Sequence, residues 1–360
     1  MSDISKQFVA VLFTGQIRTL EKTIQNFKKY ILDNNPNHTI HIYAVLECPE
    51  FDEEKKIQYT EKYNAIFEQY TDAHLKKIHW LYYQDEGLKK YKENASQILD
   101  INDNWKKYLV EESGSVTEYY QLNIGIGLIK KEVEEINKTT DSNFGYDYFM
   151  RTRCDIMLPN PITFDPMGEN NETLIKRYQC IEKMYPNANK ILLFCYFIQS
   201  LIYPFPFSLN ERFMIDKDNS QTNDYLLELY LPDDIKDITE IFNPCSENID
   251  PNEYTLLNFD FVHVFRQNLF YFSKFPLREL KYEYRRVPET KYLKGDKVDN
   301  TNESFYWFNS ENQFITHVSE IEKKIVINSY TNLEVSSLYN YDETNYINIP
   351  PYLVFYICRN

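Results

Sequence analysis

The residues best suited to chemistry in this 360-residue chain lie in the segment 146–155, YDYFMRTRCD. Its aromatic and apolar first half predicts a buried strand, and Arg151, Arg153 and Asp155 follow at alternate positions. Because side chains alternate across a strand, we expect these three to share one face at its carboxyl end, where open α/β sheets bind ligands. Two cations beside a carboxylate suit a phosphate held next to a divalent metal. A purely structural Arg–Asp ion pair is the alternative interpretation.

A second polar cluster follows the first predicted strand. Residues 8–13, FVAVLF, are a continuous apolar run, typical of a strand buried on both faces of a parallel sheet. Thr14, Gly15, Gln16 and Arg18 come directly after it. Gly15 would let the backbone approach a ligand closely, and Gln16 and Arg18 would lie near a helix amino terminus, where anions bind. A tight turn with a solvated arginine is the simpler alternative.

The elements around these clusters alternate between strand and helix. After the first strand we predict a helix over 19–32, a strand over 40–46, a helix over 53–70 and a strand near 78–83. An amphipathic helix over 117–136 precedes the arginine-bearing strand, and the glycines at 125 and 127 fall inside it, so they form no dinucleotide fingerprint. This order predicts an α/β fold with a Rossmann-type, mostly parallel central sheet flanked by helices.

The other segments have weaker patterns. Residues 86–115 are polar and rich in lysine, which indicates a surface excursion. Beyond residue 159 we expect short aromatic strands up to about residue 215, and then helical stretches over 223–230 and 253–266. The tail has no clear period, so we predict a main domain over 1–270 and an extension over 271–360 that packs on it.

Composition excludes several classes of function. The formal charge of −15 disfavours nucleic acids and anionic membranes as partners, since both need clustered positive charge. Only 8 glycines argue against a glycine-rich phosphate cradle, whereas an aromatic content of 16% suits stacking on ring-shaped ligands. Six scattered cysteines, no signal-peptide pattern and no apolar run long enough for a membrane span indicate a soluble protein, and we expect it in the cytoplasm.

Three segments together resemble the GT-A-type glycosyltransferases of large DNA viruses and bacterial surface-polysaccharide clusters. They are TGQIRT at 14–19, YYQLN at 119–123 and YDYFMRTRCD at 146–155. In that family an Arg-x-Arg-x-Asp motif stands where other GT-A enzymes carry Asp-x-Asp. A further short match is NERFMI at 210–215. The resemblance covers roughly the first 215 residues and none of the tail.

The resemblance implies a role for each matching residue. Asp155 would bind Mn²⁺ or Mg²⁺, which offsets the charge on the departing nucleoside diphosphate. Glu211 would remove the proton from the acceptor hydroxyl. The implied donor-binding residues are Thr14, Gly15, Gln16, Arg18, Tyr120, Asn123, Arg151 and Arg153. Tyr120 and Asn123 share a helix face and would contact the base or the ribose, although Tyr120 could equally be part of the core.

Two other signals compete for the metal site. Asp216 and Asp218 form a literal Asp-x-Asp after an apolar run, but Asp218 also suits a turn or a helix cap. His263 could supply a late metal ligand, and a core histidine is the simpler interpretation. We prefer Asp155 because it follows the β-α-β-α-β half of the chain.

These inferences predict a metal-dependent transfer of a sugar from a nucleoside-diphosphate sugar to a hydroxyl of a glycan or glycoprotein. Two alternatives stay open. One is a non-enzymatic carbohydrate-binding protein on a decayed glycosyltransferase fold, because the motif holds a single acid. The other is a nucleotidyltransferase, for which the loop after the first strand is poor in glycine.

Overall fold

The structure is a computed structural model that describes part of the chain. It describes residues 7–82, 84–98, 107, 110–111, 115–158, 161–164, 171–184, 186 and 193, together with the backbone of short strands between 225 and 357. Glu211, Asp216, Asp218 and His263 lie outside the described residues, so the roles expected of them stay predictions.

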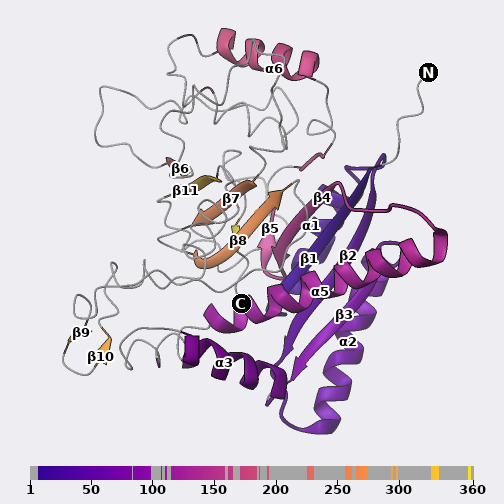
Figure 1. The fold of residues 1–360 in the computed structure, drawn as a ribbon, viewed down its shortest axis with the longest axis vertical. Helices are drawn as coiled ribbons and strands as arrows, with labels where there is room; N and C mark the ends of the chain where they lie inside the picture. The colour runs from indigo at the N-terminus through magenta and orange to yellow at the C-terminus, as the bar shows by residue number, and fades with distance from the viewer. Residues whose placement is uncertain are drawn as a thin grey trace.

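Four parallel strands form one half of the central sheet, in the order β3-β2-β1-β4 (Figure 1). They are β1 (Phe8–Gln16), β2 (Thr39–Cys48), β3 (Leu75–Tyr82) and β4 (Tyr148–Arg153). The order reverses at β1, because the chain first adds β2 and β3 on one side and then β4 on the other. The predicted α/β fold with a parallel central sheet is confirmed at this level.

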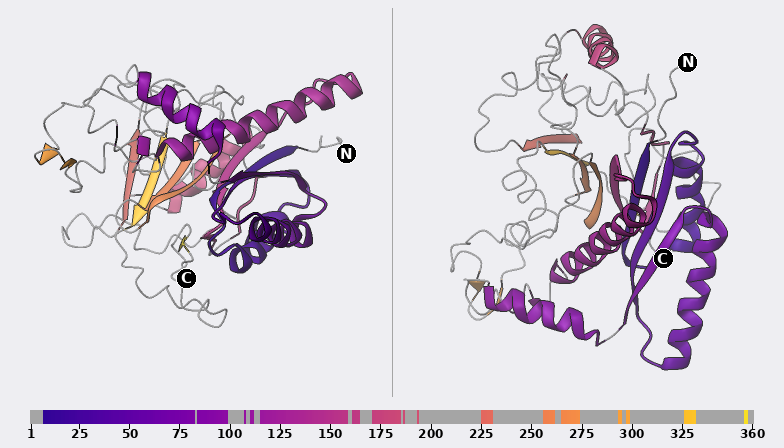
Figure 2. Two further views of the ribbon diagram at one scale, coloured as in Figure 1. Left: turned by 90° about the horizontal axis from the view of Figure 1, so that it is seen from below. Right: turned by 45° about the vertical axis from the view of Figure 1, so that its right-hand side comes forward.

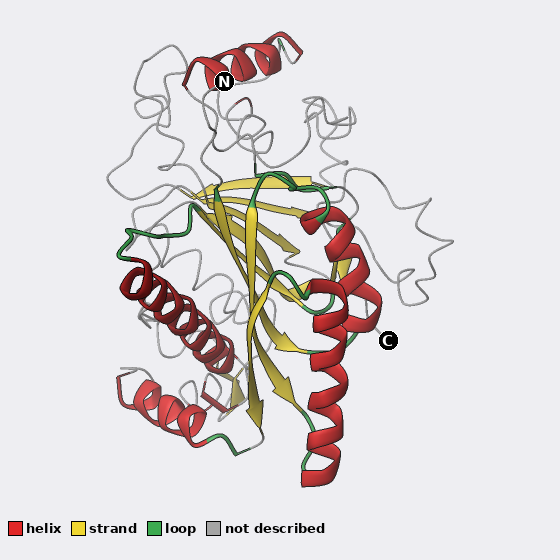
Figure 3. Cartoon of the chain, turned by 90° about the vertical axis from the view of Figure 1, so that its right-hand side faces the viewer, coloured by secondary structure: helices red, strands yellow, loops and turns green. Residues whose placement is uncertain are grey.

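Helices cover both faces of this half of the sheet (Figure 2 and Figure 3). On one face lie α1 (Leu20–Phe27), which continues as a π-helical turn (Lys28–Leu32), and α2 (Glu53–Thr71). On the other face lies α5 (Ser115–Thr140). The helices predicted over 19–32, 53–70 and 117–136 are therefore confirmed. No helix of the described part is long and apolar enough to cross a bilayer.

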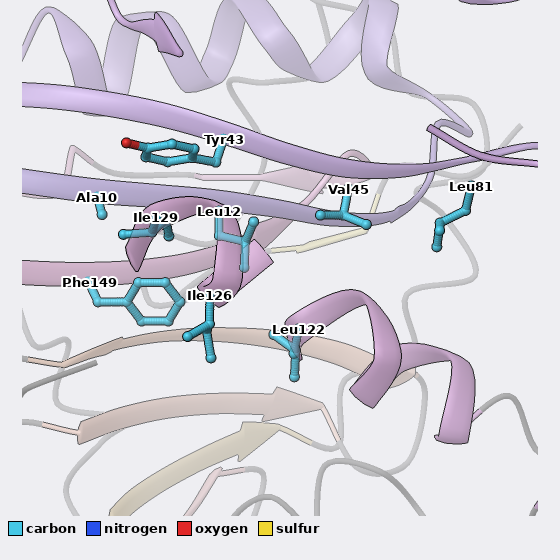
Figure 4. Packing of buried hydrophobic residues seen from close by; sticks show 9 residues of the cluster. All are labelled: Ala10, Leu12, Tyr43, Val45, Leu81, Leu122, Ile126, Ile129 and Phe149. Atoms are coloured by element: carbon cyan, nitrogen blue, oxygen red, sulfur yellow. The ribbon is translucent and has the colours of Figure 1, made fainter. Parts of the chain in front are cut away.

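Successive side chains of β1 point to opposite faces of the sheet, and they contribute to a hydrophobic core on each face. Phe13 packs edge-on against Phe27 and Phe67, with ring centroids 4.8 and 5.4 Å away. Leu12 faces α5 in a buried cluster (Figure 4). The cluster comprises Ala10, Leu12, Tyr43, Val45, Leu81, Leu122, Ile126, Ile129 and Phe149. Burial of each large apolar side chain contributes about 1.5–3 kcal/mol, which explains why the run over 8–13 has no polar position.

Glycine at position 125 lets α5 approach the sheet closely. A Cβ atom at Gly125 would lie 2.5 Å from both methyl carbons of Leu12. Leu12 is fully buried, so it has little room to move. Gly127, in contrast, is exposed, and a Cβ atom there would meet nothing within 4 Å. The packing of α5 against β1 therefore requires the first glycine and not the second.

Two buried asparagines hold the segment after β4 against the first helical region. The side chain of Asn26 accepts from the N–H of Leu158 and donates to its carbonyl, at 2.8 and 2.9 Å. Asn35 accepts from the N–H of Phe164 and donates to the carbonyl of Ile162, each at 2.8 Å. The two side chains thus form hydrogen bonds with backbone groups of a segment that forms few hydrogen bonds to neighbouring strands.

Beyond β4 the sheet continues with β8 (Phe265–Ser273), β7 (Leu256–Phe261), β11 (Val326–Thr331) and β6 (Tyr225–Tyr230). Pairing is antiparallel except between β7 and β11. Short two-stranded pairs join β5 (Ile156–Met157) to β12 (Tyr356–Ile357) and β9 (Leu293–Lys294) to β10 (Lys297–Val298). The boundary expected at residue 270 falls inside β8, and it stays a prediction.

Two local predictions are wrong. Helices were expected over 223–230 and 253–266, where the chain forms β6, β7 and the start of β8. Sheet pairing here overrides an apolar spacing that is ambiguous over such short runs. Two helices were not predicted: α3 (Glu86–Ile98) in the surface excursion over 86–115, and α6 (Asn171–Met184) beyond residue 159.

Candidate functional site

The sequence clusters after β1 and β4 meet at one point. Asp155 lies in the turn after β4, where its carboxylate accepts hydrogen bonds from Arg153 Nε and Nη2 at 3.1 and 2.9 Å. Arg18, which follows β1, donates from Nη1 to the same carboxylate at 2.7 Å. The two strands are neighbours on either side of the reversal in strand order, where doubly wound sheets bind ligands.

The backbone conformation at the end of β1 and just after it is typical of a ligand-binding loop. Gly15 has a φ of 104°, which favours glycine, and a Cβ atom there would meet nothing within 4 Å. Arg18 has a φ of 43°, uncommon for a residue with a side chain. Such conformations persist where the surrounding structure enforces them. Here the ion pair to Asp155 holds Arg18 in place.

Asp155 is ionised although it is fully buried. Burial by itself raises the pKa of its carboxyl, but the charges of Arg153 and Arg18 and their hydrogen bonds outweigh that effect and bring the pKa below its usual value. The carboxylate is thus a fixed anion that orients two guanidinium groups. Arg153 is buried, whereas 30% of the Arg18 side chain is exposed.

Arg151 has different partners from Arg153. Its Nε donates to Thr14 Oγ1 at 2.8 Å, and its Nη2 forms a short ion pair with Glu118 on α5. Arg151 and Thr14 are buried, with 1% and 0% of their surfaces exposed. The two arginines therefore fix the end of β4 from two sides, Arg151 toward α5 and Arg153 toward the turn after the strand. Glu118 lies at the start of the helix predicted over 117–136, and no role was predicted for it.

A cleft of about 1240 Å³ opens at the carboxyl ends of β1, β2 and β3. Gln16 lines it at the end of β1 and Arg18 just after that strand, while Glu47 and Tyr82 line it at the ends of β2 and β3. Phe51, with 70% of its surface exposed, also lines the cleft. Of the expected donor-binding residues, the cleft therefore brings Gln16 and Arg18 to its surface.

Tyr120 and Asn123 hold α3, which forms another wall of the cleft. Tyr120 donates its hydroxyl hydrogen to Asp85 Oδ1 at 3.0 Å, and Asn123 donates to the hydroxyl of Tyr91 at 2.8 Å. A Cβ atom at Gly87 would lie 2.2 Å from the Tyr120 oxygen, so α3 starts against this ring. Burial and the bond to Asp85 raise the pKa of Tyr120 to about 12. The shared helix face of the two residues is confirmed, and contact with a base or ribose stays a prediction.

Glu47 is a cleft residue that the sequence reasoning missed. It is the next-to-last residue of β2, beside Gln16 of β1, and one of its oxygens accepts from Gln121 Nε2 at 2.6 Å. The signal was present in the sequence, because an acid directly follows the apolar strand over 40–46. Gln121 lies between the two residues of α5 that hold α3, so one turn of this helix positions several groups of the cleft.

The described residues do not fit a divalent metal at Asp155. Both carboxylate oxygens already accept hydrogen bonds from arginines, and the residue is fully buried. Within the described part of the chain, no group of three or more acids, histidines or cysteines is placed to hold a metal ion. A metal also prefers anionic oxygens without two adjacent cations. The Mn²⁺ or Mg²⁺ site therefore stays a prediction that Asp155 alone does not support.

No protein-family model, curated protein or solved structure matches this chain. The fold does not settle the function, since doubly wound sheets carry many activities. Function must therefore be inferred from the chemistry of the cleft and of the arginine cluster beside it.

Proposed function

We propose that this chain is a GT-A-type glycosyltransferase, which moves a sugar from a nucleoside-diphosphate sugar to a hydroxyl of a glycan or glycoprotein. The observation that carries the proposal is the cleft at the carboxyl ends of three parallel strands, with Arg18 on its surface beside the reversal in strand order. Sheets of this kind bind nucleotides there. The three sequence segments that resemble the GT-A family all lie on elements around this point.

The size and lining of the cleft suit such a donor. Ligand sites of small molecules usually measure about 300–1,000 Å³, and this cleft of about 1240 Å³ leaves room for a nucleotide sugar and part of an acceptor. Phe51 and Tyr82 offer rings for stacking on a base or a sugar. Glu47 offers a carboxylate oxygen to sugar hydroxyls, while Gln121 fixes its orientation.

Arg18 is the residue that we expect to meet the phosphates. Its guanidinium keeps donors beyond the one that binds Asp155, and arginine forms forked hydrogen bonds to phosphate oxygens. Asp155 would act as a positioning residue for it. Glu211 remains our candidate for the base that takes the acceptor proton, and the cytoplasm remains the expected location.

A non-enzymatic carbohydrate-binding protein is the second candidate. The observation in its favour is the engagement of Asp155 by two arginines, which removes this acid from catalysis. Such a protein would bind a nucleotide sugar or a glycan without hydrolysing or transferring anything.

A thermal-shift screen of UDP-, GDP-, dTDP- and CMP-sugars tests the proposal, each with and without Mn²⁺. A ligand that binds only the native state stabilises it by about 2.7 kcal/mol at a hundredfold excess over its Kd. We expect one nucleotide class to stabilise the protein and Arg18→Gln to lose most of that effect, with Lys22→Gln on the exposed side of α1 as the control. A shift followed by release of the free sugar supports the enzyme. A shift without turnover on any acceptor favours the binding protein, and no shift with any donor argues against the enzyme.

A further inference from the structure

Helix α3 brings two lysines to the cleft that form no ion pair with another described residue. Lys89 and Lys92 both line the cleft, and their spacing of three places them on one side of the helix. Lys89 is exposed and Lys92 is half-buried. Among the described residues neither ammonium group has a carboxylate partner, although Glu86 and Glu93 lie on the same helix.

The positions of these lysines are fixed by contacts that neighbouring residues in and just before α3 make with α5. Asp85, just before α3, is bound by Tyr120 and also accepts from the N–H of Leu88 at 2.7 Å. Tyr91, between the two lysines, accepts from Asn123 and packs on Tyr120 with ring centroids 5.2 Å apart. The face of α3 that carries Lys89 and Lys92 is thus held toward the strand ends.

We propose that Lys89, Lys92 and Arg18 form an anion-binding subsite, which takes the diphosphate of the donor without a divalent metal at Asp155. This inference rests on the proposed function for the identity of the ligand, but the subsite itself follows from the lining of the cleft. Three side-chain cations line one cavity, whereas the acid expected to hold a metal is buried between two arginines.

The carboxylates of the cleft limit where an anion can bind. Glu47 and Asp85 are oriented by Gln121 and Tyr120, so their charges stay in fixed places. Further negative charges in the lining come from Glu86, Glu93 and Glu111. An anion is therefore favoured only next to the three cations, and its binding weakens as salt screens them.

The subsite has a defined part in the transfer. The bond between the anomeric carbon and the diphosphate oxygen breaks, and its electron pair stays on that oxygen. The acceptor oxygen forms the new bond to the anomeric carbon, and its proton passes to a base. Negative charge thus grows on the diphosphate, where side-chain cations stabilise it.

Calorimetric titration with sodium pyrophosphate in EDTA tests the subsite directly. We expect binding by the wild-type chain and a loss of affinity of about tenfold or more in the double variant Lys89→Gln/Lys92→Gln, since charge-assisted bonds to phosphate are lost. Lys90→Gln is the matched control, because this lysine is exposed on the same helix and does not line the cleft. It should bind as the wild type does.

The outcomes separate this inference from the proposed function. Pyrophosphate that binds only with Mn²⁺, or binds equally well to the double variant, overturns the subsite. Pyrophosphate binding that depends on the lysines, with no nucleotide sugar bound, keeps the subsite and removes the glycosyltransferase. Donor binding in EDTA that the double variant loses supports both.

Discussion

The guanidinium of Arg18 and the carboxylate of Asp155 lie 2.7 Å apart, although 137 residues separate them in the chain. One follows β1 and the other follows β4, so their ion pair joins the ends of two adjacent strands. With Arg153 on the same carboxylate, the pair forms a buried cluster of two cations and one anion. This cluster determines how Arg18 faces the cleft.

Replacing Asp155 by asparagine should lower the free energy of unfolding by about 3 kcal/mol. The change removes one counter-charge from the buried guanidinium of Arg153, and removal of one partner from a buried pair typically costs that much. Urea unfolding followed by circular dichroism measures it. Asp33→Asn is the control, because its pair with Lys28 is exposed and should contribute less than about 1 kcal/mol. Equal effects of the two changes would contradict a structural role of the cluster.

The two glycines of α5 should respond in opposite directions to alanine. Gly125→Ala places a methyl group against the buried Leu12 and should destabilise the protein by about 1–3 kcal/mol. Gly127→Ala meets no atom within 4 Å and should stabilise it by up to about 1 kcal/mol through higher helix propensity. Thermal unfolding of both variants checks this. A stabilised Gly125→Ala would mean that α5 packs less closely on β1.

Tyr120→Phe should loosen α3 without unfolding the domain. The change removes the hydroxyl that donates to Asp85, a bond of about 1 kcal/mol, and keeps the ring against Tyr91. Hydrogen exchange of the amides over 86–98 should therefore rise, while that of β1 stays as in the wild type. Tyr70→Phe, which loses an exposed bond to Gln25, serves as the control and should leave α3 unchanged. Unchanged exchange over 86–98 in Tyr120→Phe would show that other contacts hold the helix.

Stability should fall between about pH 6.5 and pH 4 because of His41. Burial, with the charges of Lys76 and His74, lowers the pKa of His41 from 6.5 to about 4. The neutral His41 contributes fully to the free energy of unfolding above pH 6.5, the pKa of this side chain in the unfolded chain. The contribution is lost as pH falls toward 4, because the unfolded state binds the proton first. Between pH 7 and pH 5 the wild type should lose about 2 kcal/mol more than His41→Gln. Urea unfolding at each pH measures this. If the free energies of unfolding of the wild type and of His41→Gln fell in parallel with pH, the prediction would be wrong.

Periodicity predicted the first half of the fold well, because its elements are long and buried. The apolar run over 8–13 was assigned as a strand and the segment over 53–70 as a helix, and both are found. The segments over 223–230 and 253–266 are short, and their apolar residues suit a helix as well as a strand. Pairing partners distant in sequence decide between the two. Helix α3 was missed because its hydrophobic residues are few and its support comes from Tyr120 and Asn123.

Sequence reasoning predicted some of the contacts among the candidate site residues, and their chemical role stays a prediction. Alternation placed Arg153 and Asp155 together, and topology placed Gln16 and Arg18 at a ligand-binding edge. The sequence does not reveal that Arg18 forms an ion pair with Asp155. That contact depends on the left-handed backbone conformation of Arg18 and on the pairing of β1 with β4. Glu118 and the lysines of α3 joined the site through tertiary contacts, for which short motifs carry no signal.

The central place of β1 has a consequence for synthesis of the chain on the ribosome. Its residues Val9 to Thr14 pair with β2 soon after they emerge, but the opposite edge must wait for the strand at 148–153. Until then the nascent protein carries an open, apolar strand edge at its centre, of the kind that promotes aggregation. Chains stalled before residue 148 should therefore depend on chaperones, and release from that dependence should coincide with the arrival of Asp155 beside Arg18.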